Sequence, residues 1–170
     1  PDQDDFNLQR WEEVMADPHY AQLDGTFETN RFGQVIHMPP PSFLHARLQS
    51  QISLLLSERL TGGGTATECP VSTSDGVKGV DVAWLSDEQL QAVGAFLCVP
   101  FAPTICVEIK SPSNSRSELE EKKALYFEAG AREVWICDEK RAMTFYLRDS
   151  GVEPSSASLL CPTFPPTISV

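Results

Sequence analysis

The chain has 170 residues, of which 22% are charged and 41% hydrophobic, with a formal net charge of −11 and a sequence pI near 4.6. This length and composition predict one globular domain with a substantial hydrophobic core, and exclude a disordered chain. The acidity disfavours tight, non-specific binding along a polyanion, because such binding depends on Lys and Arg replacing counterions.

The cysteines and the apolar segments indicate the cellular compartment of the protein. The five cysteines are odd in number and scattered, without the C-x-x-C spacing of zinc and redox sites, so we expect free thiols and a cytoplasmic location. The acidic N-terminus lacks a signal-peptide pattern. The most apolar region, 93–109, is interrupted by Pro100 and Pro103 and falls short of the ~20 residues of a membrane span. No membrane span is therefore expected.

Hydrophobic periodicity and turn residues predict alternating helices and strands. An amphipathic helix is predicted at 8–17, and a β-hairpin at 26–38 around Asn30 and Gly33. Ser42 is predicted to N-cap a helix that runs to about Leu60. The remaining predicted elements are strands near 65–71 and 79–85, a short helix near 87–93, a strand at 105–109, a helix from the capping box Ser117-Glu118-Leu119-Glu120 to Ala129, and strands at 133–137 and 143–147.

Helices interleaved with strands in this order predict an α/β domain with a mixed central β-sheet flanked by helices. We expect a single domain over residues 1–170, with its core at about 10–150. The tail 151–170 is rich in Ser and Pro and is expected to lie extended on the surface.

The most informative stretch is 105–112, which places Glu108 and Lys110 two residues apart in an apolar, strand-like run. Both point to one face of a strand, opposite the odd-numbered apolar residues. The run 79–85 is expected to alternate in the same way, with Asp81 among apolar neighbours. Two carboxylates can hold Mg²⁺ or Mn²⁺, and an ammonium can act on the attacking water and the phosphate. The pattern predicts a metal-dependent phosphodiesterase with Asp81 and Glu108 as metal ligands and Lys110 as a catalytic residue.

A set of ordered motifs along about residues 10–150 extends this prediction. The motifs are Glu28–Ile36, Met38–Pro41 followed by His45, Val80–Ala83, Val107–Ser113, and Glu121-Lys122 followed by Tyr126, Gly130 and Val134-Trp135. In these motifs the chain resembles the Uma-type family of restriction-endonuclease-like proteins, within the PD-(D/E)XK nuclease superfamily. Members of that family usually have proline where this chain has Val80, and many lack the lysine that is Lys110 here. The resemblance implies a restriction-endonuclease-like fold with Asp81, Glu108 and Lys110 as its catalytic core.

Three further residues are candidates for the site, each with a structural alternative. The resemblance places Glu28 near the site, although an acid in a hairpin is commonly a surface residue. His45 lies in the first turn of its helix, where it could contact a phosphate or serve in capping or packing. Leu119, Lys122 and Tyr126 share one helical stripe, so Lys122 would lean inward toward a site carboxylate or a bound phosphate. The alternative is a solvated lysine among its charged neighbours.

The predicted function is that of a Mg²⁺- or Mn²⁺-dependent endonuclease that cleaves phosphodiester bonds in DNA. A homodimer is expected, because cutting both strands of a duplex calls for two sites. Two alternatives remain open: a catalytically quiet nuclease fold that serves as a binding module, and a metal-dependent hydrolase of a smaller phosphorylated substrate.

Overall fold

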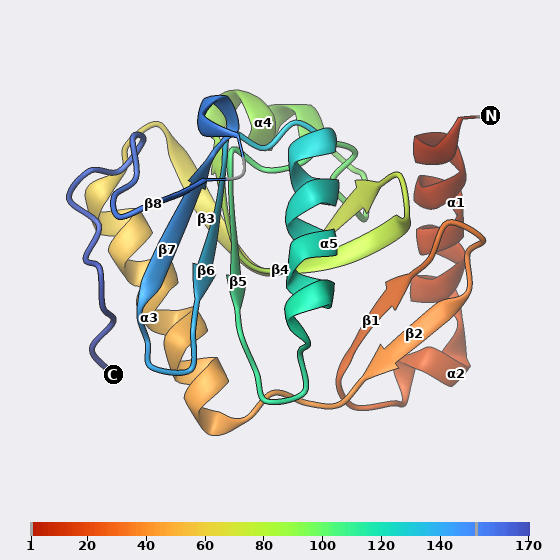
Figure 1. The fold of residues 1–170 in the computed structure, drawn as a ribbon. Coiled ribbons are helices and arrows are strands. Elements are labelled where there is room, and N and C mark those ends of the chain that lie inside the picture. Colours follow the sequence, from red (N-terminus) through yellow and green to blue (C-terminus); the bar gives the residue numbers. More distant parts are fainter. Residues whose placement is uncertain (1, 152) are drawn as a thin grey trace.

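A six-stranded sheet forms the centre of the computed structural model, which describes residues 2–151 and 153–170 (Figure 1). The strands follow the order β3-β4-β5-β6-β7-β8, and only the β5–β6 pair is parallel. Their bounds are β3 Gly63–Thr73, β4 Gly76–Ser86, β5 Ile105–Ile109, β6 Glu133–Cys137, β7 Met143–Leu147 and β8 Pro154–Ser155. The predicted α/β fold with a mixed sheet is confirmed.

Two helices cover opposite faces of this sheet. Helix α3 (Phe43–Arg59) packs Leu48, Ile52 and Leu56 against one face, and α5 (Arg116–Glu128) packs Tyr126 against the other. Figure 1 shows α5 in front of the sheet and α3 behind it. The predicted alternation in β5 is confirmed, since its odd-numbered residues join the α3-side core and Cys106 joins the α5-side core.

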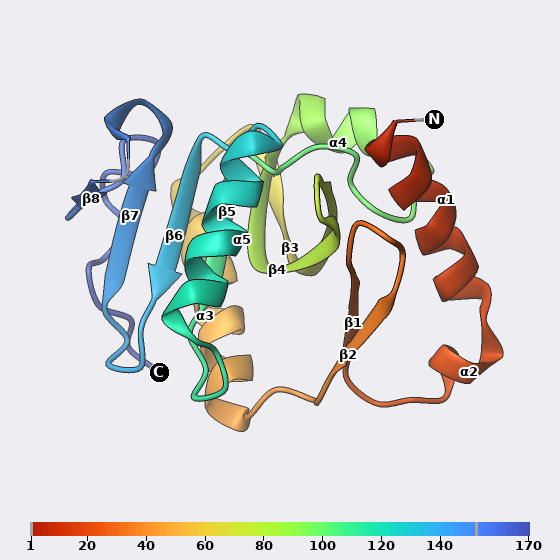
Figure 2. The same cartoon turned by 45° about the vertical axis from the view of Figure 1, so that its right-hand side comes forward.

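A smaller layer packs against the outer half of β3 and β4. It contains α1 (Gln3–Ala16), α2 (Pro18–Ala21) and the two-stranded sheet of β1 (Thr26–Thr29) and β2 (Val35–Met38). Figure 2 shows the β1–β2 hairpin standing apart from the central sheet, between α5 and α1. Trp11 of α1 and Val77 of β4 are buried together in this layer. The remaining helices are α4 (Asp87–Val93) and the short 3₁₀ helix Arg148–Ser150.

Local capping explains where the two core helices begin. The Ser42 hydroxyl accepts a hydrogen bond from the backbone N–H of His45, as the sequence predicted. Helix α5 starts two residues earlier than expected, because the capping box pairs Ser115 with Glu118 rather than Ser117 with Glu120.

Strands β3 and β4 bend at two opposed residues, Glu68 and Asp81. The flanking pairs are Thr67↔Val82 and Cys69↔Val80, so neither strand carries an inserted residue. Glu68 has a φ of 49°, in the left-handed region that costs a residue with a side chain about 1–2 kcal/mol. The bend therefore stores strain at Glu68.

The bend also exchanges the faces of the two strands. Val82 packs on the α3 side of the sheet, whereas Val80, two residues earlier, packs on the α5 side. The alternation expected through Asp81 is therefore wrong. Beyond the bend, β4 no longer pairs with β5, because its register with that strand covers only Val82–Trp84. The sheet opens at this point.

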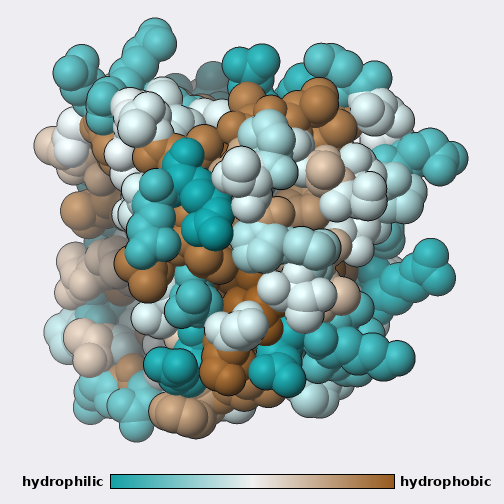
Figure 3. All heavy atoms as spheres, turned by 90° about the vertical axis from the view of Figure 1, so that its left-hand side faces the viewer, coloured by the Kyte–Doolittle hydropathy of each residue, from teal (hydrophilic) through white to brown (hydrophobic). Residues whose placement is uncertain are grey.

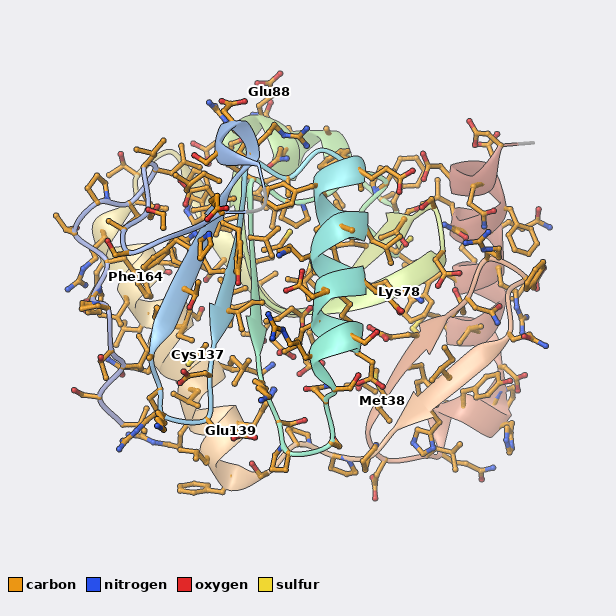
Figure 4. The ribbon with its side chains drawn as sticks, in the orientation of Figure 1. Met38, Lys78, Glu88, Cys137, Glu139 and Phe164 are labelled. Carbon is orange, nitrogen blue, oxygen red and sulfur yellow. The ribbon has the colours of Figure 1, made fainter. Side chains whose placement is uncertain are left out.

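The C-terminal tail is packed into the core rather than extended on the surface, which corrects the prediction. Cys161, Phe164 and Ile168 are buried in the α3-side core, and the rings of Phe164 and Trp135 lie 4.7 Å apart. Figure 4 labels Phe164 at the left of the molecule, and Figure 3, which views the left-hand side, shows apolar patches between hydrophilic groups. The Ser and Pro content concealed the apolar residues that the tail inserts.

The buried carboxylate of Glu133 holds the start of this packed tail. Its Oε1 accepts the backbone N–H groups of Leu159 (3.0 Å) and Leu160 (2.9 Å). Its Oε2 accepts from Trp135 Nε1 (2.7 Å) and Ser158 Oγ (2.6 Å).

In the part of the chain that the structure describes, no helix is long and apolar enough to cross a membrane.

Candidate functional site

Asp81 lies where β4 separates from β5, and its carboxylate fills the gap. Asp81 Oδ2 accepts the backbone N–H of Ile109 at 2.7 Å and lies 3.4 Å from Nε2 of His45. Among the residues described, these contacts engage Oδ2, which leaves Oδ1 available for another ligand. The aspartate thus holds the open edge of the sheet and presents a carboxylate oxygen to the site.

His45, Glu68 and Asp81 form a group of potential metal ligands. One ligand atom of each lies within 4.8 Å of the others. The side chains of His45 and Asp81 are 13% and 15% exposed, while Glu68 is exposed. The three come from different elements, α3, β3 and β4, and meet at the bend.

Gln49 positions two members of this group. It follows His45 by one turn of α3, so both side chains lie on the same helix face. Its Nε2 donates to Glu68 Oε1 at 2.5 Å and to the backbone oxygen of Asp81 at 3.1 Å. Because Gln49 is buried, this link fixes the carboxylate of Glu68 relative to the bend.

A second group, on the α5 side of the sheet, contains Glu28, Glu108 and Lys122. The ammonium of Lys122 lies 2.8 Å from Glu28 Oε2 and 3.8 Å from Glu108 Oε1. Glu28 also accepts the backbone N–H of Gly79 at 2.6 Å, and Tyr126 donates to Glu108 Oε1 at 2.5 Å. The contacts of Lys122 join β1, β5 and α5 at one point.

The electrostatics show that these two groups form one cluster. We call Glu28, Glu68, Asp81 and Glu108 the acidic cluster. Burial raises the pKa of Glu108 well above its usual value; the charge of Lys122 opposes this rise and that of Asp81 adds to it. Burial also raises the pKa of Glu68, against the hydrogen bond from Gln49 and with the charge of Asp81. Asp81 therefore acts on both groups.

The two basic members respond to the same negative charge. The hydrogen bond with Asp81 raises the pKa of His45 more than burial lowers it. Burial would lower the pKa of Lys122, but Glu108 and Glu28 outweigh it and raise the pKa overall. Lys122 is therefore a charged ammonium that pairs with Glu28 and Glu108.

Lys110, the lysine of the E-x-K pattern, is placed differently. Strand β5 ends at Ile109, and the ammonium of Lys110 lies 3.9 Å from Glu139 Oε1. Figure 4 shows Glu139 at the turn between β6 and β7, below the lower ends of these strands. The structure thus brings Asp81, Glu108, Glu28, His45 and Lys122 into one region, whereas the ammonium of Lys110 pairs with Glu139.

The donor set fits a divalent cation. Carboxylate oxygens are ligands for Mg²⁺ and Mn²⁺, and imidazole nitrogen is a ligand for transition metals. Nδ1 of His45 is buried and has no hydrogen-bond partner among the described residues. The negative surplus of the acidic cluster would also be relieved by a cation. The surface hollow of about 370 Å³ at the β3–β4 turn is lined by none of these residues.

Two residues of the site, Glu68 and Gln49, were not predicted from the sequence. A polar stripe at intervals of four residues, His45, Gln49 and Ser53, crosses the otherwise apolar face of α3, and could have indicated Gln49. Glu68 had no comparable signal, because its position depends on the left-handed bend.

Comparisons with known proteins agree with this fold. A family model described as "Uma2: Putative restriction endonuclease" matches residues 11–169. The chain is also similar to the crystal structure of "a putative nuclease belonging to DUF820" from Anabaena variabilis, with a TM-score of 0.64, 17% identity and 80% of each chain covered. At this identity the likeness is one of fold. A comparison with curated proteins gave no match. Because the family model spans nearly the whole chain, the protein belongs to the Uma2 family, which confirms the resemblance seen in its sequence.

Proposed function

We propose that this protein is a metal-dependent endonuclease that hydrolyses phosphodiester bonds in DNA with Mg²⁺ or Mn²⁺. The observation that carries the proposal is the meeting of the acidic cluster with Lys122 at the point where β4 leaves β5. A cluster of perturbed titratable groups at an opening in a sheet is a common property of catalytic sites. Membership of the Uma2 family supports this choice of reaction.

Asp81 is the central ligand in this proposal, with His45 and Glu68 on one side and Glu108 on the other. A bound divalent cation would supply an activated water and offset negative charge on the phosphate. Glu108 as a ligand stays a prediction, because its Oε1 is held by Tyr126 and faces Lys122. Its carboxylate would reach the cation by its other oxygen.

Lys122 is the lysine that the proposal places next to the reacting phosphate. Its contacts with Glu28 and Glu108 keep it charged, so it would stabilise negative charge in the transition state rather than accept a proton. Glu28 would position it. The role of Lys110 in catalysis stays a prediction. Its long contact with exposed Glu139 would also leave its ammonium able to contact a neighbouring phosphate along the DNA strand.

The test is cleavage of supercoiled plasmid DNA by the purified protein with Mg²⁺, with Mn²⁺ and with EDTA. We expect nicked or linear plasmid with a cation and none with EDTA. Asp81→Asn should abolish cleavage, whereas Asp24→Asn, at an exposed loop position, should leave it unchanged. Cleavage that persists in EDTA, or in Asp81→Asn, would contradict the proposal.

Two other outcomes would favour the alternatives. Hydrolysis of bis(p-nitrophenyl) phosphate without cleavage of plasmid, single-stranded DNA or RNA would indicate a hydrolase of smaller substrates. Absence of divalent-metal binding would indicate a binding module, which the net charge of −11 also suits. A homodimer belongs to the proposal, because cleavage of both strands of a duplex needs two sites. Analytical ultracentrifugation of the protein without DNA would measure its oligomeric state.

A further inference from the structure

We propose that the cation binds in a subsite made by His45, Glu68 and Asp81, one ion per chain, and that this subsite prefers Mn²⁺ to Mg²⁺. The inference rests on the proposed function, because it specifies the ion of the same site. It concerns ligand identity, so it can be tested by binding as well as by cleavage.

The first argument is the chemistry of the three donors. Mg²⁺ binds oxygen ligands in near-ideal octahedral geometry and keeps several waters, and it gains little from an imidazole. Carboxylates suit both Mg²⁺ and Mn²⁺, while imidazole suits transition metals, which gain affinity from nitrogen ligands. Two carboxylates with one imidazole therefore favour Mn²⁺.

The second argument is geometry. His45 Nε2 and Asp81 Oδ2 lie 3.4 Å apart, a separation that two ligands of one ion can adopt. Glu68 completes the set within 4.8 Å, and Gln49 holds its carboxylate. The buried Nδ1 of His45 lacks a hydrogen-bond partner among the described residues, so no hydrogen bond there fixes the tautomer of the imidazole.

The third argument limits the number of ions. Glu28 and Glu108 already surround the ammonium of Lys122, at 2.8 Å and 3.8 Å. A second divalent ion between these two carboxylates would compete with that ammonium and be repelled by it. Glu68 and Asp81 have no lysine or arginine ion pair among the described residues, so the unmatched charge lies in the subsite with His45.

The experiment combines calorimetric titration with electron spin-echo spectroscopy of bound Mn²⁺. Wild type should bind one Mn²⁺ per chain at least tenfold more tightly than Mg²⁺, and should show the ¹⁴N coupling of a directly bound imidazole. His45→Asn replaces nitrogen by an oxygen ligand, so the ¹⁴N signal should disappear and the preference should shrink. His19→Asn, at an exposed position of α2, is the matched control and should behave as wild type.

A second variant keeps the inference testable if His45→Asn does not fold. Glu68→Gln should weaken the binding of both ions while retaining the ¹⁴N signal. Mn²⁺ binding without a ¹⁴N signal in wild type, or an unchanged preference in His45→Asn, would overturn the inference and leave the proposed function standing. Failure of wild type to bind any divalent ion would overturn both.

Discussion

Asp81 and Ile109 are joined by a 2.7 Å hydrogen bond from the backbone N–H of Ile109 to Asp81 Oδ2, across the gap where β4 and β5 part. One carboxylate therefore does two things. It satisfies a strand N–H that has lost its ladder partner, and the same Oδ2 lies 3.4 Å from Nε2 of His45, in the group that also contains Glu68. A residue that looks purely catalytic in sequence is also part of the sheet.

Substitutions at Asp81 should separate these two roles. Asp81→Asn can still accept the Ile109 N–H through its amide oxygen and removes repulsion with Glu68 and Glu108, so in EDTA it should be at least as stable as wild type. Asp81→Ala leaves that N–H unpaired and should cost about 1–3 kcal/mol. A cation at 100 times its Kd should stabilise wild type by about 2.7 kcal/mol and Asp81→Asn much less. Urea unfolding with EDTA and with Mn²⁺ measures both; an equal response to Mn²⁺ would show that Asp81 is only structural.

The two candidate lysines should differ in both stability and activity. Lys122→Met leaves the nearly buried carboxylates of Glu28 and Glu108 unpaired, which should cost about 3 kcal/mol of unfolding free energy. Cleavage should fall by ~10²-fold or more, the scale of one preorganised electrostatic contact. Lys110→Met is the matched control; its 3.9 Å contact with exposed Glu139 should be worth less than about 1 kcal/mol. If Lys110→Met loses cleavage and Lys122→Met keeps it, the assignment made from the sequence holds instead.

Glu133→Gln should loosen the C-terminal tail, although it only replaces one carboxylate oxygen by an NH₂ group. The glutamate oxygens face four donors, two backbone N–H groups and two side chains. An amide has one oxygen, so its NH₂ group must face two of those donors, and we expect a loss of about 2–4 kcal/mol. Hydrogen exchange at the amides of Leu159 and Leu160 should accelerate. Glu153→Gln, an exposed acid nearby in sequence, should leave exchange at these amides unchanged.

The cysteine thiols should resist modification in the folded protein. All five are free and buried, and burial raises the pKa of Cys69, Cys98 and Cys137 to about 12. At pH 8 these thiols stay protonated, so reaction with Ellman's reagent should be slow until the protein is unfolded. The ordinary pKa of a cysteine thiol is 9.0. At a pH above this value the thiols lose their protons in the unfolded chain but keep them in the folded protein, so the free energy of unfolding should decrease as pH rises. Fast reaction of several thiols without denaturant would contradict this burial.

Much of the site followed from local pattern. In β5, alternation set Glu108 opposite its apolar neighbours, and steps of three and four along α5 set Lys122 beside Tyr126, facing inward. These positions could be predicted because they depend on the period of one element. The caps of α3 and α5 are local as well, although the second capping box lay two residues from its expected place.

Only the tertiary structure decided how these pieces meet. Glu68 has a left-handed φ at the point where β3 and β4 bend, and no period in the sequence records such a bend. Lys110 lies 3.9 Å from Glu139, which follows it by 29 positions and reaches it only because β6 pairs with β5. The start of the tail is held by Glu133, which is far from it in sequence and accepts hydrogen bonds from its backbone. The sequence by itself determined the elements and the inward faces of two of them; contacts between distant segments decided which charges share one centre, because charge pairing depends on distance in space rather than along the chain.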